Sequence, residues 1–324
     1  MAGTVIITAA NSSLAIPAVQ HLLAKFPDYT AVLTVRDTTD NDINTKKLRA
    51  TIAKVPNARA SIHQLDLAKL SAVNEFADGI AEKIQNGSLP PLASLICNAY
   101  YWNLVGEAET TVDGYEKSIQ VSHLAHAALI FRLLGSFGSE GGRIVLFASD
   151  AHFPGKNGLE KYPPTLPDDL ELLVKPGPDK PVDNLGRGFQ RYANSKLAVV
   201  TWLYALNRYL EKEPKLGKIT AVAINPGNLT DSRALRTKTP MMLVILSRFV
   251  FPLFRPLLRF MDPTMRSSAE AGIDVIDLAT EKSHPHQRGY FTLLKEDVSA
   301  PETLHETKQQ DLWEKTLQWT KTTL

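Results

Sequence analysis

Two side chains four residues apart, Tyr192 and Lys196, could carry acid–base chemistry. They fall in a segment that we predict to be helical as far as Tyr209. Positions i and i+4 share one face of a helix, so the phenol and the ammonium would project together. A neighbouring ammonium favours the phenolate, which lowers a tyrosine pKa that starts near about 10. Such a tyrosine can exchange a proton near neutral pH. A Tyr–Lys pair at this spacing also arises by chance, so its weight depends on the elements around it.

Short apolar segments alternate with helical segments on both sides of this pair. The alternation indicates βαβ units, and therefore an α/β, doubly wound, Rossmann-type parallel sheet with helices on both faces and ligands at the carboxyl ends of the strands. The predicted strands cover 4–8, 30–35, 61–65, 92–97, 143–148, 219–224 and 289–293, and the predicted helices cover 14–25, 44–54, 72–84, 112–134, 192–209 and 267–279.

Two segments interrupt the alternation. We treat the chain as a single domain, 1–324, with insertions at about 153–191 and 228–265 and a C-terminal helix at about 302–320. The first insertion is rich in proline, which excludes a continuous helix. Long loops inside a compact domain often serve as lids. Because both insertions leave from the expected ligand edge, we expect them to cover the substrate.

Composition narrows the class of protein. The formal net charge is only +2, with 22% charged residues, which argues against a nucleic-acid partner. A single cysteine, Cys97, excludes an internal disulfide framework, and no cysteine, histidine or carboxylate spacing suggests a metal site. The first residues show no charged leader and no apolar signal core, so we expect an intracellular, cytoplasmic protein.

One apolar segment, 241–261, raises the question of a membrane. It is interrupted by Arg248, Pro252, Arg255, Pro256 and Arg259. A spanning helix needs about 20 largely uncharged residues, so we do not predict a spanning segment. A lid over an apolar pocket and a peripheral contact with lipid both remain open.

With Tyr192 and Lys196 on a helix after the fifth strand, the chain resembles the short-chain dehydrogenase/reductase family. The likeness runs roughly from Gly3 to Leu293. It implies that Tyr192 exchanges the proton, that Lys196 holds the nucleotide ribose and that Ser149, at the end of the fifth strand, binds a carbonyl oxygen. It also implies a fourth catalytic position, an asparagine of a proton relay, which is Ser122 here. His123 or His126 could replace that asparagine, although packing of a helix histidine is the simpler interpretation.

The resemblance also implies a dinucleotide site, with one large departure. The family's glycine-rich turn reads Thr8-Ala9-Ala10-Asn11-Ser12-Ser13-Leu14-Ala15 here, without any glycine. Glycines there permit a tight turn and close approach of the backbone to a pyrophosphate. Tyr100 stands where another family glycine would follow Asn98 and Ala99; with Tyr101 and Trp102 it would either line the pocket or pack on the insertion. Arg36 ends the second strand and favours the 2′-phosphate of NADP over NAD. The implied cofactor-binding positions are Thr8, Asn11, Ser12, Ser13, Leu14, Arg36, Asp66, Leu67, Asn98, Ala99, Tyr192, Lys196, Pro226, Gly227, Leu229 and Thr230.

The sequence therefore predicts an NADPH-dependent carbonyl reductase that acts on a bulky, apolar substrate, similar to reductases of fungal secondary metabolism. Two alternatives remain open. One is a non-redox isomerase, dehydratase or cyclase that uses Tyr192 and Ser149, and the other is a binding protein that has lost the cofactor. The resemblance also allows a homodimer, paired through the helices that hold Ser122 and Tyr192.

Overall fold

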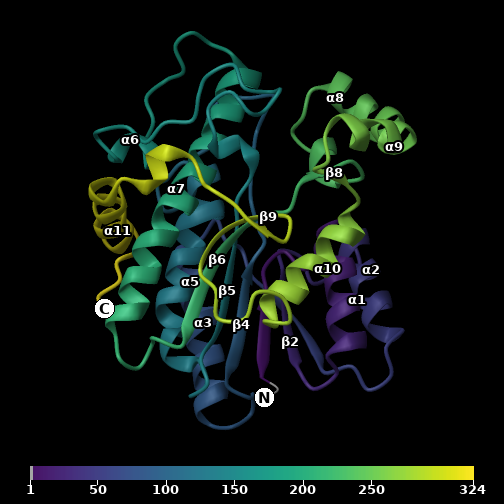
Figure 1. Cartoon of the computed structure of the whole chain (residues 1–324), viewed down its shortest axis with the longest axis vertical. Helices are drawn as coiled ribbons and strands as arrows, with labels where there is room; N and C mark the ends of the chain where they lie inside the picture. Colours follow the sequence, from purple (N-terminus) through teal and green to yellow (C-terminus); the bar gives the residue numbers. More distant parts are fainter. Residues whose placement is uncertain (1–2) are drawn as a thin grey trace.

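A twisted sheet forms the centre of the molecule (Figure 1). The computed structural model describes residues 3–324, without the side chains of 252, 255 and 256, so the predicted interruptions at Pro252, Arg255 and Pro256 lie outside the described side chains. Within that part of the chain the sheet has eight strands in the order β10-β9-β6-β5-β4-β1-β2-β3. The strands are β1 (Thr4–Ile7), β2 (Thr30–Val35), β3 (Ala60–Gln64), β4 (Leu92–Cys97), β5 (Gly142–Phe147), β6 (Ile219–Asn225), β9 (Gly289–Thr292) and β10 (Lys295–Glu296).

The predicted fold class is confirmed, because β1 to β6 and β9 pair in parallel and the chain reverses its winding direction between β3 and β4. The short strand β10, which the sequence did not indicate, pairs antiparallel with β9 at the sheet edge. Strands β1, β5 and β6 are buried along almost their whole length, as expected for strands covered on both faces. Their carboxyl ends lie at one edge of the sheet, where a ligand is expected.

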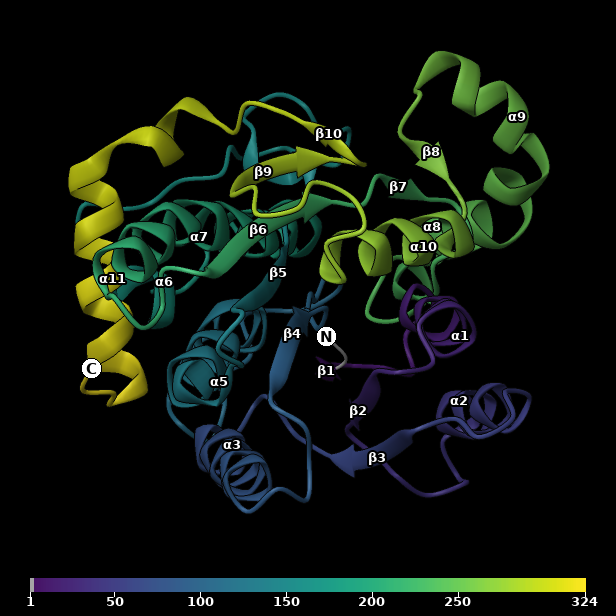
Figure 2. The same ribbon diagram turned by 60° about the horizontal axis from the view of Figure 1, so that its bottom comes forward.

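Helices cover both faces of the sheet (Figure 2). One buried apolar cluster joins the sheet to α3, α5 and α7, and a second joins its other face to α1 and α10. The helices are α1 (Ala15–Lys25), α2 (Ile43–Ala53), α3 (Leu70–Gln85), α4 (Lys117–Ile119), α5 (Ala125–Leu133), α6 (Glu171–Val174), α7 (Asn184–Lys212), α8 (Met241–Ile245), α9 (Phe251–Met261), α10 (Ser268–Ala279) and α11 (Glu306–Thr320).

Three predicted helix boundaries differ from the structure by four residues or more. The helix expected to begin at 112 begins at Lys117, because Gly114 turns the chain with φ +82° and the Glu116 carboxylate caps the Ile119 amide. Residues 184–191, placed in the first insertion, already belong to α7, whose first turn is capped by Asp183. The C-terminal helix begins at Glu306 rather than 302, after a separate 3-10 turn, Pro301–Leu304.

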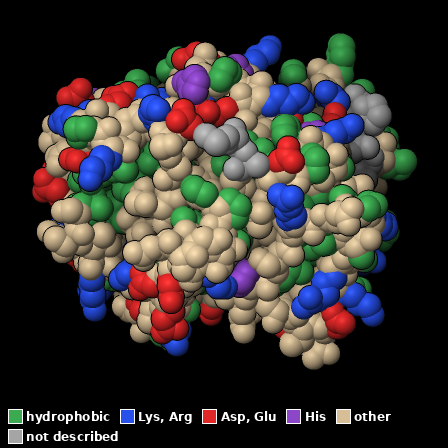
Figure 3. Space-filling view, turned by 90° about the horizontal axis from the view of Figure 1, so that it is seen from below, with side chains coloured by type: hydrophobic (Ala, Val, Ile, Leu, Met, Phe, Trp, Pro, Cys, Tyr) green, Lys and Arg blue, Asp and Glu red, His purple; other side chains and the backbone are tan. Residues whose placement is uncertain are grey.

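The second insertion carries its own small structure. Two short parallel strands, β7 (Asn228–Leu229) and β8 (Met265–Arg266), bring its ends together. Between them, α8, a π-helical turn (Leu246–Val250) and α9 stand away from the sheet in Figures 1 and 2. None of the helices in the described part of the chain combines the length and the apolar character that crossing a membrane requires. The face drawn in Figure 3 mixes acidic and basic side chains, in keeping with the small net charge.

Candidate active site

Three of the four residues predicted to be catalytic, Ser149, Tyr192 and Lys196, meet at the carboxyl edge of the sheet. Tyr192 and Lys196 lie on one face of α7, and the Lys196 ammonium donates to the Phe147 carbonyl at the end of β5, at 2.8 Å. Ser149, two residues further on, lies close enough to Tyr192 for a hydrogen bond between the two hydroxyl groups. The strand end and the helix therefore bring the three side chains together, as the sequence predicted.

The predicted lowering of the Tyr192 pKa by Lys196 is wrong for the protein without a nucleotide. Burial raises the pKa of the Tyr192 phenol above its ordinary value, the nearby Tyr100 and Asp150 raise it further, and the hydrogen bond with Ser149 only partly opposes them. Lys196 contributes little because burial lowers its own pKa to about 7, and its Nζ lies 5.6 Å from the centre of the Tyr192 ring. Tyr192 is thus protonated near neutral pH, as a proton donor must be.

An aromatic wall encloses the Tyr192 ring. The ring of Tyr100 lies 5.7 Å from it, centre to centre, and the ring of Trp102 lies 5.5 Å from it. Tyr100 also lies over the Lys196 ammonium, at 5.3 Å, which is a cation–π contact. Both predicted roles apply to Tyr100, because it lines the site and its phenol contacts Ser232 of the second insertion. Both also apply to Trp102, because its indole nitrogen donates to Thr237 of the same insertion.

Ser149 is held by residues that the sequence analysis did not identify. Its hydroxyl donates to Asp150 Oδ1 at 3.0 Å and accepts from the Ala151 amide at 3.2 Å. The buried His152 contacts the Ser149 carbonyl through Nδ1 and accepts from the Ala300 amide, 148 residues away, through Nε2. These contacts give a neutral imidazole, and burial lowers its pKa to about 4. No sequence pattern indicated His152, because its partner comes from the C-terminal segment.

Ser122 lies within a π-helical turn, Gln120–Leu124. Its hydroxyl is buried and has no hydrogen-bond partner among the described residues. His126 contacts the Ser122 carbonyl and, through Nε2, the Thr8 hydroxyl at 3.0 Å. His123 contacts the hydroxyl of Thr316 of α11 through Nε2, at 2.9 Å. Packing therefore accounts for His123, whereas His126 connects the Ser122 turn to the end of β1.

The turn without glycine contains one residue with a left-handed backbone. Ala9 adopts a left-handed backbone, φ +48°, at a position where glycine would be unstrained. The Asn98 side chain compensates, because its Nδ2 donates to the carbonyls of Thr8 and Ala9 and lies 3.2 Å from the Ser12 hydroxyl. No acidic residue occupies the first turn of α1, so its positive end favours an anion. Its first amides are already used: the Ala15 amide donates to the Ser12 hydroxyl, the Ile16 amide donates to the Ser12 carbonyl, and residue 17 is a proline, which has no amide proton.

A cation from the second insertion lies against this turn. The guanidinium of Arg233 donates to the Asn11 carbonyl, and the Arg233 amide donates to the Ser13 hydroxyl at 3.0 Å. Arg36 is exposed at the end of β2. Its positive charge acts to lower the pKa of the Tyr101 phenol, against the larger effect of burial, which raises that pKa. The positive end of the helix and the two arginines suit the charge of an anionic dinucleotide. Tyr100 does not fit in its present position, because its ring lies over the lysine that would hold the ribose.

The remaining predicted positions divide into two groups. Pro226 and Gly227 turn the chain after β6, and Gly227 has φ +84° with no room for a Cβ, which would lie 2.5 Å from the Thr264 carbonyl. Leu14 is buried beside this edge. The side chains of the second group make other contacts. Leu67 and Ala99 are buried in the core, and Leu229 packs against the second apolar cluster. The Thr230 hydroxyl donates to the Arg266 carbonyl, and the exposed Asp66 carboxylate accepts from the Ala68 amide.

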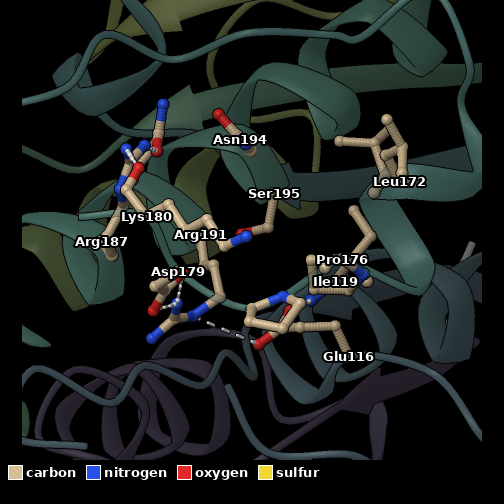
Figure 4. A pocket seen from close by; sticks show the side chains of 14 residues that line it. Glu116, Ile119, Leu172, Pro176, Asp179, Lys180, Arg187, Arg191, Asn194 and Ser195 are labelled. Atoms are coloured by element: carbon tan, nitrogen blue, oxygen red, sulfur yellow. Dashed lines mark hydrogen bonds and ion pairs between the residues drawn. The ribbon is translucent and has the colours of Figure 1, made fainter. Parts of the chain in front are cut away.

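A separate cavity of about 270 Å³ lies between α7 and the loop around α6 (Figure 4). Arg191 reaches across it to Asp179, at 2.7 Å, and towards Glu116. Asn194, which lines the cavity, is two residues after Tyr192 on α7. Consecutive helix residues are rotated by about 100°, so these two side chains project in nearly opposite directions. The cavity is therefore distinct from the catalytic edge of the sheet.

Comparison with known proteins decides the family. Short-chain dehydrogenase iccH of Talaromyces variabilis is 30% identical over 97% of this chain and 94% of its own length. The chain belongs to the short-chain dehydrogenase/reductase family. This confirms the predicted resemblance, including the link to fungal enzymes, and makes the protein an oxidoreductase by family.

Three further similarities concern this short-chain dehydrogenase. A family model described as AcuH dehydrogenase domain matches residues 233–324, and dehydrogenase acuH of Aspergillus aculeatus is 52% identical over 25% of this chain and 83% of its own length. Among solved structures, an F189W variant of actinorhodin polyketide ketoreductase with NADPH has a TM-score of 0.58 at 16% identity, covering 90% of this chain and 96% of the ketoreductase. At this identity the likeness concerns the fold.

Proposed function

We propose that the protein is an NADPH-dependent reductase of a carbonyl group on a bulky, apolar molecule. The observation that carries the proposal is the meeting of Tyr192, Lys196 and Ser149 at the carboxyl end of β5. A ketoreductase of the same fold binds NADPH. The aromatic wall of Tyr100 and Trp102 favours an apolar substrate over a charged one.

The residues that would hold the dinucleotide form two groups. The turn from Thr8 to Leu14, held by Asn98 and faced by Arg233, would take the pyrophosphate. Arg36 would pair with the 2′-phosphate, because a guanidinium matches a phosphate in geometry and charge. The hydride for the carbonyl carbon is the contribution of the bound nicotinamide.

The chain's own residues handle the proton and the oxygen. Tyr192, protonated because of its burial, would donate its phenolic proton to the carbonyl oxygen as the alcohol forms. Ser149 would turn its hydroxyl from Asp150 to the same oxygen and stabilise its developing charge. The Lys196 ammonium, next to the Phe147 carbonyl, would bind the ribose and stabilise the phenolate that remains.

Replacement of Tyr192 by phenylalanine tests the proposal. We expect the Tyr192→Phe variant to bind NADPH as the wild type does and to lose at least about 10²-fold in kcat with aromatic ketones, since general acid catalysis is typically worth that much. The matched control is Tyr209→Phe, seventeen residues further along α7, which should leave turnover unchanged. Full activity of the Tyr192→Phe variant would refute the role of the phenol. Turnover that persists without any nucleotide would support the non-redox alternative.

A further inference from the structure

The apolar arm, which we define as residues 241–261, exposes an unusual amount of hydrophobic surface. It comprises α8, the π-helical turn and α9. Phe260 is 87% exposed, Leu253 72% and Phe249 63%. Monomeric proteins rarely leave a contiguous group of large apolar side chains in water, and such groups commonly mark a surface for a protein or a membrane. The other exposed side chains of this group are Met241, Met242, Ile245, Phe254, Leu257 and Met261.

Charge decides between these partners. The arm contains three basic residues, Arg248, Arg255 and Arg259, and no acidic residue, although the whole chain carries a formal net charge of only +2; Arg259 pairs with Glu270 of α10 at 2.9 Å. Arg248 is exposed and lies over the ring of Phe249, at 5.7 Å, so a basic group stands directly beside the hydrophobic surface. A second copy of the same arm would bring like charges together, which disfavours a symmetric dimer through this surface.

We propose that the apolar arm docks on the surface of an anionic phospholipid bilayer. Its exposed apolar side chains would enter the boundary between headgroups and acyl chains, and its basic residues would face the anionic headgroups. The arm would lie on the bilayer and not cross it, since α9 has only 11 residues.

The base of the arm is joined to the catalytic edge. The Leu104 amide donates to the Lys238 carbonyl at 2.8 Å, and the Trp102 indole donates to Thr237. Trp102 in turn contacts Tyr192. Docking would therefore bring the aromatic wall of the site close to the lipid, where an apolar substrate dissolves. This consequence rests on the proposed function, whereas the docking itself does not.

Vesicle flotation with the full chain, without nucleotide or substrate, tests the docking. We expect the wild type to float with phosphatidylcholine vesicles that contain phosphatidylserine, more weakly at high salt because salt screens the basic residues. The double variant Phe249→Ser/Phe260→Ser should bind these vesicles at least about tenfold more weakly, because both rings would lose their contact with the acyl chains. The matched control Val112→Ser/Val298→Ser, with exposed side chains elsewhere on the surface, should bind as the wild type does.

Three results would overturn the proposal. The first is that the wild type does not float with the phosphatidylserine-containing vesicles. The second is that the double variant binds these vesicles as strongly as the wild type. The third is that the wild type binds no vesicles but forms a dimer that the double variant does not form. Because Phe249 and Phe260 are exposed, the double variant should keep the wild-type Tm, and this measurement excludes unfolding as a cause. Since no reaction is measured, a failure here leaves the proposed reductase activity intact.

Discussion

The Tyr100 ring lies over the Lys196 ammonium, with 5.3 Å between Nζ and the ring centre. In the family pattern this position is a glycine, which leaves the space beside the lysine open. The ring is 38% exposed, and its phenol contacts Ser232 of the second insertion. Tyr100 therefore occupies the space beside Lys196, and we expect the binding of a nucleotide ribose by this lysine to displace the ring.

Replacement of Tyr100 by glycine should strengthen NADPH binding. The nucleotide would no longer have to displace a cation–π contact worth about 0.5–2 kcal/mol, so we expect the Kd to fall by about two- to 30-fold. Fluorescence titration measures this change. The control Tyr101→Gly alters a neighbouring ring that contacts Glu109 instead of Lys196, and should not improve binding. Weaker binding by the Tyr100→Gly variant would mean that the ring supports the nucleotide and does not obstruct it.

Removal of the Arg233 side chain should weaken NADPH binding. The guanidinium lies at the turn that would hold the pyrophosphate, and a charge-assisted hydrogen bond contributes about 1.5–3 kcal/mol. We therefore expect the Kd of the Arg233→Ala variant to rise by about 10- to 150-fold in calorimetric titration. Arg236→Ala, on the same 3-10 turn but exposed, is the matched control and should have a smaller effect. Equal losses in both variants would indicate a general effect of charge and no specific contact.

The buried histidines should make the protein sensitive to mild acid. Burial lowers the pKa of His123 to about 3, and those of His126 and His152 to about 4. In the unfolded chain a histidine accepts its proton near pH about 6.5, so the stability is fully present above that pH and is lost as the pH falls towards 4. Each histidine contributes up to about 1.4 kcal/mol per pH unit in this window.

His152→Gln isolates one of these contributions. The loss of stability between pH about 7.5 and 5, measured by urea denaturation, should be smaller in this variant than in the wild type by up to about 2 kcal/mol. His305→Gln replaces an exposed histidine whose side chain has no hydrogen bond or ion pair among the described residues, and it should leave the pH dependence unchanged. If both variants keep the wild-type pH dependence, the His152 imidazole is not buried as described.

Lys196 should affect stability in the alkaline range. Its pKa is about 7 in the folded protein because of burial, whereas the unfolded chain keeps the proton to pH about 10.4. Between these values the unfolded chain binds more protons, so stability should rise with pH, by up to about 1.4 kcal/mol per unit from this group. The Lys196→Met variant should lack this rise in urea denaturation between pH 7 and 9, whereas Lys215→Met, at the surface, should retain it. A rise that persists in the Lys196→Met variant would contradict the burial of the ammonium.

Much of the fold could be predicted because it depends on local patterns. The bounds of β2 and β4 match the sequence prediction, since apolar runs of β-branched and aliphatic residues between polar turns define a buried strand. The meeting of Tyr192, Lys196 and Ser149 followed from the parallel sheet, which brings strand ends together. The family resemblance supplied their roles.

Contacts between distant segments could not be predicted from one sequence. Arg233 and Asn11 are 222 residues apart, and neither lies in a motif that indicates the other. His152 and Ala300 are likewise joined only in the folded chain. The Tyr192 pKa was predicted in the wrong direction because the spacing of Tyr192 and Lys196 does not reveal how deeply both are buried.

Titration of the wild-type protein with NADPH and NADH tests the central claim, that a glycine-free turn still holds a phosphorylated dinucleotide beside Tyr192. We expect saturable binding of one NADPH per chain, with NADH at least about tenfold weaker, because only NADPH offers the 2′-phosphate to Arg36. No saturable binding of either nucleotide would contradict the claim, and equal binding of both would remove the role assigned to Arg36.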